Sequence, residues 1–586
     1  MTNRKIVLLS VAFVFFTSTI SFCVAATITG ASDDPARPMQ WHKVTLTIDG
    51  PLTSEDARQN PFLDYRMNVT FTHPATETKY VVPGYYAADG DAANSSASSG
   101  NKWRAHLCPD YDGTWHYTVS FRQGRDVAVN DSATAGNTMP PYDGISGSFK
   151  VAKTDKTGRD MRAKGRLEYV GKHFLRFAGN GEYFFKQGVD APENFLAYKD
   201  FDGSFKTDGQ NDNYIKSWAP HVSDWNTGDP TWSKLDGTPG TYGKGIIGAI
   251  NYLAGEGLNA FSFVPMNIEG DDKNVFPYIN YNQHIRMDCS KLDQWEIVLA
   301  HGDRMGMFLH FKTLETENEL LLDGGDLATQ RRLYYRELIA RFSHHLALNW
   351  NLGEEINNAS TAQKVSWAQY FYDNDPYRHH IVIHNGANHY ELMGAASELT
   401  GFSLQTNQPD FSRVFTMTKD YIDRSVSAGK PWAVACDEPG NAQHGLRPDS
   451  DPGNSHEDGR KNALWGTFMA GGYGNEWYFG YRYDHSDLTC QDFRSRNAYW
   501  DYCRFALQFF SASNDPARKP VPAWNMSNAD SRAGGTGNHC LYGNDDDGKP
   551  CFVVSTDNGG SFTLNTPPAA LYKVGWMNAK TGDWQY

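Results

Sequence analysis

Residues 346–357 read LALNWNLGEEIN, an apolar run of strand length that stops at two adjacent carboxylates. Adjacent carboxylates repel each other, and burying either one is costly unless it is paired or hydrogen-bonded. Two interpretations fit this stretch. Either a helix begins here and the acids suit its positive N-terminal end, or a strand ends here and one acid is held ready to give a proton.

The sequence around this stretch favours the strand. Short apolar runs alternate with helix-like stretches or long loops after residue 160, which predicts an α/β fold, a (β/α)8 TIM barrel, over residues 160–515. The runs are 183–189, 258–264, 306–311, 346–352, 380–384, 401–405, 432–436 and 475–480. The quoted stretch is then the end of the fourth strand.

Both flanks of the predicted barrel have the pattern of β structure. Residues 33–153 alternate polar and apolar residues between Gly, Pro, Asn and Asp clusters, which is typical of an antiparallel β-sandwich. Residues 516–586 return to turns and short strands and predict a small C-terminal β domain. The end at Tyr586, directly after TGDWQ, hints that this domain lacks a strand.

The first residues predict a secretory signal. Arg4 and Lys5 precede the apolar stretch 6–16, and Val24 to Ala26 are small enough for cleavage. The stretch is too short to span a membrane, and no later apolar run is long enough. We therefore expect cleavage near Ala26 and a mature protein that is secreted or periplasmic.

Composition and motifs exclude several classes of partner and of catalytic site. The net charge of −14 argues against a nucleic-acid partner, because phosphate binding needs a basic face. The chain holds no Cys-x-x-Cys, His-Glu-x-x-His or Gly-x-Ser-x-Gly, so we expect no metal, no cofactor and no serine nucleophile. Cys540 and Cys551 flank the hairpin-turn signal Asp547-Gly548 and are candidates for a cross-strand disulfide.

Active sites of (β/α)8 barrels lie at the carboxyl ends of the strands, so the residues after each run are candidates. Acids follow the fourth and seventh runs, at opposite sides of the predicted mouth: Glu354 and Glu355, and Asp437 and Glu438. Cleavage of a glycosidic bond with retention needs two carboxyl groups about 5–5.5 Å apart. One must stay protonated while the other stays ionised.

These motifs resemble those of clan A glycoside hydrolases. WNLGEE (350–355) is similar to their fourth-strand motif Trp-x-Leu-Gly-Asn-Glu, and WAVACDEPG (432–440) is similar to their seventh-strand motif. Within the clan the chain most resembles apiosidase-like barrels, which carry a leading β-sandwich and a C-terminal domain named for collagen binding; YKVGWMNAKTGDW (572–584) resembles that domain. The resemblance implies that Glu355 is the acid/base and Glu438 the nucleophile. Glu354 departs from the pattern, because many relatives have a sugar-binding Asn there.

Other strand ends are expected to bind the sugar. Trp477 is predicted to form a stacking floor, whereas His310 and His384 either bind hydroxyls or make structural hydrogen bonds. Strand alternation should turn Asp437 away from Glu438. The predicted substrate-binding residues are Asp190, Asn194, Asn267, His310, Glu354, Asn357, His384, Gln405 and Trp477.

The long segment 194–243 follows the first strand and contains Trp218, Trp225 and Trp232, which either line a binding surface or pack the loop. We therefore expect an exported retaining glycoside hydrolase that acts on a polysaccharide or oligosaccharide. The alternative is a non-catalytic carbohydrate-binding or adhesion protein built on the same barrel.

Overall fold

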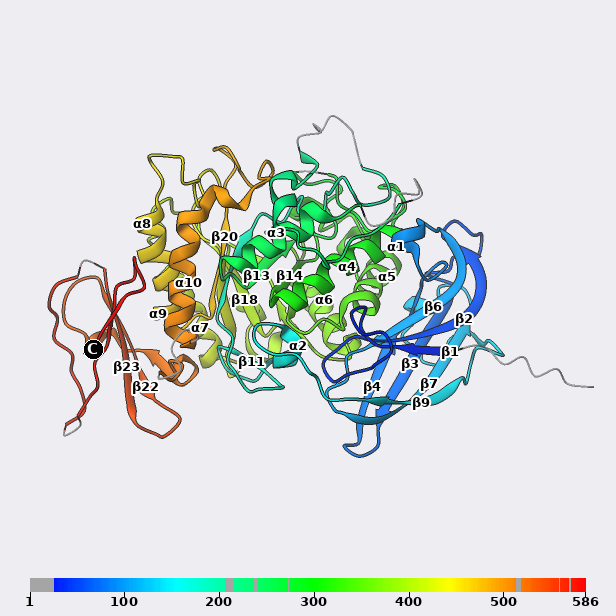
Figure 1. The fold of residues 1–586 in the computed structure, drawn as a ribbon, viewed down its shortest axis with the longest axis horizontal. Coiled ribbons are helices and arrows are strands. Elements are labelled where there is room, and N and C mark those ends of the chain that lie inside the picture. Colours follow the sequence, from blue (N-terminus) through cyan, green and yellow to red (C-terminus); the bar gives the residue numbers. More distant parts are fainter. Residues whose placement is uncertain are drawn as a thin grey trace, which may run out of the picture.

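A computed structural model describes residues 26–205, 214–234, 241–271, 273–512, 518–557, 559–568 and 571–586. The molecule is elongated, with the barrel in the middle, the N-terminal β-sandwich at one end and the C-terminal β-sheets at the other (Figure 1). The predicted signal segment, residues 1–25, lies outside the described residues. Within the described ranges, no helix has the length and apolar character needed to cross a bilayer.

The central sheet confirms the predicted barrel. Its parallel strands follow the order β16-β15-β14-β13-β12-β20-β19-β18-β17, and the first and last members are two pieces of one stretch interrupted at Ile383. The sheet therefore nearly closes on itself. The strands are β12 (Lys186–Asp190), β13 (Ala260–Phe263), β14 (Phe308–Lys312), β15 (Leu348–Asn351), β16 (His380–Val382), β17 (His384–Asn385), β18 (Gly401–Gln405), β19 (Ala433–Glu438) and β20 (Gly474–Tyr478).

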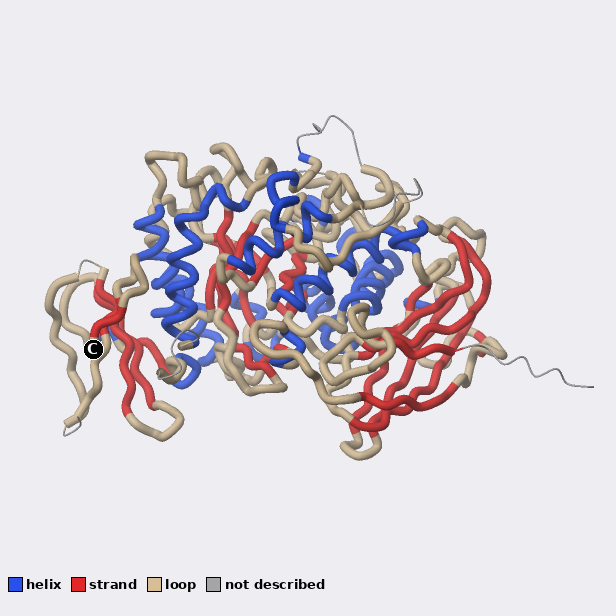
Figure 2. Tube along the Cα trace, in the orientation of Figure 1, coloured by secondary structure: helices blue, strands red, loops and turns tan. Residues whose placement is uncertain are grey.

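Helices surround these strands (Figure 2), which is why the strands are buried on both faces and read as continuous apolar runs. Ser360 and Gln363 form a capping box that starts α6, and Gly306 ends α4 in the left-handed region at φ 71°. The barrel helices are α3 (Lys244–Gly255), α4 (Cys289–Met305), α5 (Thr329–Phe342), α6 (Thr361–Asn374), α7 (Val414–Ser427), α8 (His456–Asp458), α9 (Gly466–Met469) and α10 (Asn497–Ser511).

The N-terminal part is a two-sheet sandwich, as its alternating pattern predicts. One sheet has the order β1-β2-β6-β5, and the other has β4-β3-β7-β8 with β9 also paired to β7. The elements are β1 (Ala26–Thr29), β2 (Val44–Ser54), β3 (Tyr65–His73), β4 (Thr78–Pro83), β5 (Tyr85–Tyr86), α1 (Ala92–Ser95), β6 (Ser99–Leu107), β7 (Gly113–Gln123), β8 (Asn137–Thr138) and β9 (Ser146–Val151). Helix α2 (Met161–Lys164) and the hairpin of β10 (Leu167–Tyr169) and β11 (Leu175–Phe177) lead into the barrel.

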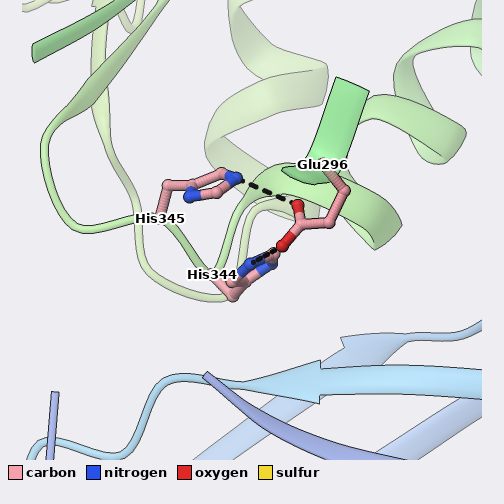
Figure 3. Close-up of side chains that lie close together, drawn as sticks. All are labelled: Glu296, His344 and His345. Atoms are coloured by element: carbon pink, nitrogen blue, oxygen red, sulfur yellow. Dashed lines mark hydrogen bonds and ion pairs between the residues drawn. The ribbon is translucent and has the colours of Figure 1, made fainter. Parts of the chain in front are cut away.

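A half-buried ion-pair group joins the sandwich to the barrel. Lys43 Nζ of the sandwich lies 2.6 Å from Glu296 Oε1 on α4. The same carboxylate contacts His344 Nε2 at 3.0 Å and His345 Nε2 at 3.1 Å (Figure 3). His345 also contacts Asp303 through Nδ1 at 2.7 Å. Charges from both parts therefore neutralise one another at this junction.

The C-terminal part contains a three-stranded antiparallel sheet and a separate two-stranded one. The strands are β21 (Met526–Asn528), β22 (Asn538–Asn544), β23 (Pro550–Thr556), β24 (Trp576–Met577) and β25 (Trp584–Gln585). The hairpin register places Cys540 opposite Val554 and Cys551 opposite Gly543. The predicted disulfide is therefore wrong, because the two cysteines are out of register, and all seven cysteines of the described chain are free thiols.

The tryptophans of segment 194–243 pack inside the protein. Trp218 and Trp232 are fully buried, and Trp225 is half-buried with Lys244 Nζ 4.3 Å from its ring centre. Of the two interpretations, loop packing therefore holds for Trp218 and Trp232. Residues 206–213 and 235–240 of this segment lie outside the described residues.

Candidate active site

The two acids of the quoted stretch follow a strand and do not begin a helix. Strand β15 ends at Asn351, and the next helix, α6, begins only at Thr361. Gly353 is required at this turn, because a Cβ there would lie 2.5 Å from Ile356 Cδ1. Glu355 has a left-handed backbone at φ 45°. Such a conformation costs about 1–3 kcal/mol in a non-glycine residue, so the surrounding structure must hold it in place.

A bulge in β19 brings two neighbouring acids into the barrel. Leu404 pairs with Cys436 and Gln405 pairs with Glu438, so Asp437 is the extra residue. Asp437 contacts Lys186 Nζ at 2.5 Å and Ser403 Oγ at 2.7 Å, both on other barrel strands. The expectation that alternation turns Asp437 away from Glu438 is therefore wrong, because the bulge breaks the period of two.

Gln405 connects the acids of the fourth and seventh strands. Its Nε2 donates to Glu355 Oε1 and, at 3.0 Å, to Glu438 Oε1. Because one amide group contacts both carboxylates, the Glu355 and Glu438 side chains lie close together. Glu438 is 5% exposed, whereas Glu355 is partly exposed at the mouth. The pair thus has one member facing the interior and one facing solvent.

His384 and Lys312 complete the site around Glu354 and Glu438. His384 Nε2 lies 3.0 Å from Glu438 Oε2 and 3.5 Å from Glu354 Oε1. Lys312 Nζ lies 2.8 Å from Glu354 Oε2 and 2.8 Å from Asp190 Oδ1. All these groups except Glu355 are at least nine-tenths buried, so their interactions are only weakly screened by water.

Burial controls the protonation of this group. It raises the pKa of the Glu354 carboxyl well above its ordinary value, more than Lys312 lowers it. It also raises the pKa of Glu438, against the opposing effects of Lys312 and of the hydrogen bond from Gln405. Burial and Lys312 lower the pKa of His384 to about 3. His384 is therefore a neutral imidazole at physiological pH, and Lys312 is the cation that faces the acids.

A second polar layer lies deeper in the barrel. His310 Nδ1 contacts Glu476 Oε2 at 2.6 Å, and Lys186 Nζ lies 3.5 Å from Glu476 Oε1. Ser403 Oγ donates to Asp437 and contacts His384 Nδ1 at 2.9 Å. This layer links Glu438 to the interior through His384 and Ser403. The contact between Ser403 and Nδ1 orients the His384 imidazole so that its Nε2 faces Glu438.

Sequence reasoning did not select the buried charges of the deeper layer. Lys186 stands inside the run YFFKQGV and Glu476 inside NEWYFG. A charged residue within an otherwise apolar barrel strand was the available signal, because such a residue must find a partner when buried. Asp487, in the loop after β20, carries no comparable sequence signal.

The other predicted sugar-binding residues divide into two groups. Asp190, Glu354, His384 and Gln405 gather around Glu438, as described above. Asn194, Asn267 and Asn357 hold loops: Asn194 Nδ2 donates to the Tyr214 and Leu488 carbonyls, Asn267 Oδ1 accepts from the Gly270 N–H, and Asn357 Oδ1 accepts from Asn385.

Two predicted substrate contacts lie away from the mouth. His310 is fully buried in the deeper layer, where Asn351 Nδ2 is 2.9 Å from its Nε2. Trp477 is fully buried and packs edge-on against Tyr499 of α10, with ring centres 4.5 Å apart. The prediction that Trp477 forms a stacking floor is therefore wrong. Its neighbour Glu476 points into the barrel, and strand alternation turns Trp477 outward to the helices.

Comparisons with known proteins agree with the fold. The family described as "Domain of unknown function (DUF5060)" matches residues 37–122, within the N-terminal sandwich. A comparison with curated proteins found no match. Among solved structures, a "putative glycoside hydrolase" from Bacteroides vulgatus is similar, with a TM-score of 0.56 and 16% identity over 87% of this chain and 84% of that one.

Two further structures are less similar. One is described as "Glycoside hydrolase" (TM-score 0.45, 14% identity, 67% of this chain and 84% of that one). The other is a glycoside hydrolase family 5 protein from Bacteroides vulgatus (TM-score 0.43, 14% identity, 65% of this chain and 78% of that one). The likeness to the first of the three structures, at 16% identity, shows a shared fold alone.

Proposed function

We propose that the protein is an exported retaining glycoside hydrolase that acts on a polysaccharide or oligosaccharide. The observation that carries the proposal is that the Gln405 amide donates to both the Glu355 and the Glu438 carboxylate. These two acids stand at the ends of different strands of the barrel mouth. A pair of carboxyl groups flanking one small space is what a double displacement at a sugar carbon requires. The signal-like start of the sequence supports export.

In the first step, a Glu438 oxygen attacks the anomeric carbon while the bond to the leaving oxygen breaks. The carboxylic acid of Glu355 gives its proton to that oxygen. In the second step, the Glu355 carboxylate takes a proton from water, the water oxygen attacks the anomeric carbon, and the ester to Glu438 breaks. Gln405 donates to Glu438 Oε1, which orients the attacking carboxylate.

Glu354 competes with Glu355 for the role of proton donor. Burial raises the pKa of Glu354, as a general acid needs. However, Glu354 is only 4% exposed and is held by Lys312, whereas Glu355 faces the solvent side from which a leaving group departs. Accessibility therefore favours Glu355 as the donor and Glu354 as a residue that positions the sugar.

Azide rescue of three variants tests this assignment. Glu438→Ala should lose nearly all turnover on every substrate. Glu355→Ala should lose about 10²–10⁴-fold on poor leaving groups, cleave activated aryl glycosides, and regain rate with azide to give a glycosyl azide of retained configuration. Glu354→Gln should keep measurable turnover.

Two results would contradict the assignment. Azide rescue in Glu354→Ala but not in Glu355→Ala would make Glu354 the donor. A wild-type chain that binds glycans from a polysaccharide panel yet cleaves none would favour the carbohydrate-binding alternative.

A further inference from the structure

Within the described chain, four groups of acid or histidine side chains hold ligand atoms within 4.8 Å of one another. Three of these groups either have a lysine beside them or belong to the candidate active site. Glu296 lies with His344 and His345 (Figure 3) and also contacts Lys43. Asp437 and Glu476 beside His310 contact Lys186. Glu354, His384 and Glu438 form the site described above. The fourth group, Glu193, Glu315 and Glu354, is different.

These three carboxylates come from three loops at the barrel mouth. Glu193 follows β12, Glu315 follows β14 and Glu354 follows β15, and these loops leave the same end of the sheet. Glu193 and Glu315 are each 6% exposed. The 4.8 Å limit on the separation of their oxygens matches a shell of oxygen ligands at about 2.3–2.6 Å from a common centre.

Several oxygens around this space have no hydrogen-bond partner. Glu193 Oε2 and Glu315 Oε2 are buried without a hydrogen bond, and so is Oδ1 of the neighbouring Asp487, although the Glu193 and Asp487 carboxyl groups also share a side-chain hydrogen bond. Each such atom carries the full cost of its lost hydration. Two buried lysines lie nearby. Lys312 is held between Asp190 and Glu354 at 2.8 Å from each, and Lys216 Nζ donates to the backbone carbonyls of Leu488 and Cys490 at 2.7 and 2.8 Å.

We propose that Glu193, Glu315 and Glu354 bind a divalent cation of the calcium type, with Asp487 beside it. The ligand set is all carboxylate oxygen, which suits a hard cation, and it contains no histidine or cysteine that would select zinc. The ion ties together the loops after three strands. This site shares Glu354 with the candidate active site but does not include the nucleophile, and it goes beyond the metal-free site expected from the sequence.

Binding of Ca²⁺ alone, without any glycan, tests the proposal. The purified chain is treated with EDTA, dialysed at pH 7.5, and titrated with CaCl₂ by calorimetry, while Tb³⁺ luminescence excited through tryptophan gives a second measure. We expect one saturable ion per chain and a Tm that rises with Ca²⁺. Glu315→Gln and Glu193→Gln should each weaken binding at least about tenfold, since affinity depends on ligand charge.

Glu317→Gln is the matched control. Glu317 lies in the same loop as Glu315 but is exposed, so the same substitution should leave Ca²⁺ binding unchanged. Far-UV circular dichroism verifies that each variant is folded. Absence of saturable binding up to about 10 mM Ca²⁺, beyond the weakest protein sites, would overturn the proposal. So would Glu193→Gln and Glu315→Gln proteins that bind Ca²⁺ as wild type does, and neither outcome would bear on the roles of Glu355 and Glu438.

Discussion

Replacing Gln405 by Met should shift the acidic limb of the pH–rate profile upward. Gln405 Nε2 donates to Glu438 Oε1 at 3.0 Å and lowers the pKa of that buried carboxyl. A hydrogen bond to a charged group is worth about 1.5–3 kcal/mol. The loss of this bond should therefore destabilise the ionised form of Glu438 by that amount and raise the pKa of the carboxyl further.

The sign follows from the role of Glu438. The nucleophile must be ionised, and a raised pKa means that its ionised form is lost at a higher pH as the solution is acidified. The assay is kcat/KM against pH on the aryl glycoside that the enzyme cleaves fastest. The basic limb of the profile, which reports the proton donor, is recorded in the same assay.

Gln187→Met is the control. Gln187 is also buried in the barrel, but its side chain contacts Asn475 and Trp477. Its replacement should leave both limbs in place while changing stability by a comparable amount. A folded Gln405→Met protein whose acidic limb stays at the wild-type pH would refute the reasoning, since Glu438 would then either not be the nucleophile or not depend on this hydrogen bond.

Three further predictions follow from the same structure. Proton NMR of the earliest product should show the anomeric configuration of the substrate, and the opposite anomer would exclude a double displacement. Lys312→Met should lower the free energy of unfolding by about 3–5 kcal/mol in urea at neutral pH, because Asp190, whose pKa burial raises to about 6, would remain as a buried carboxylate without its cation; an unchanged midpoint would show that Asp190 is neutral. Burial lowers the pKa of His345, but Glu296 and Asp303 outweigh it and raise the pKa to about 9. The folded pKa is thus above the unfolded value of about 6.5, so a stabilisation on the order of 3 kcal/mol should be complete below pH ~6.5 and lost as the pH rises to about 9. His345→Gln should abolish that decline, whereas His173→Gln, whose pKa is lowered by burial to about 4, should leave it unchanged.

The sequence by itself determined the architecture. Parallel strands covered on both faces must be apolar along their length, so the runs from 183–189 to 475–480 all mark strands of the barrel. The carboxyl ends of such strands meet at one mouth, and this placed Glu355, Glu438, His384 and Gln405 in one region before any distance was known. The flanking β patterns likewise correspond to the sheets at either end of the molecule (Figure 1).

Only the tertiary structure decided which way individual side chains point. The bulge in β19 turns the Asp437 side chain to the inner face of the barrel, and no local sequence pattern predicts this bulge. Trp477 and Glu476 are adjacent in sequence, yet one packs against α10 and the other enters the barrel. The register of β22 and β23 separates Cys540 from Cys551. The Glu193 and Glu315 carboxyl groups lie together because loops distant in sequence converge at the mouth. Each of these outcomes depends on non-local pairing, which a single sequence does not encode in any short stretch.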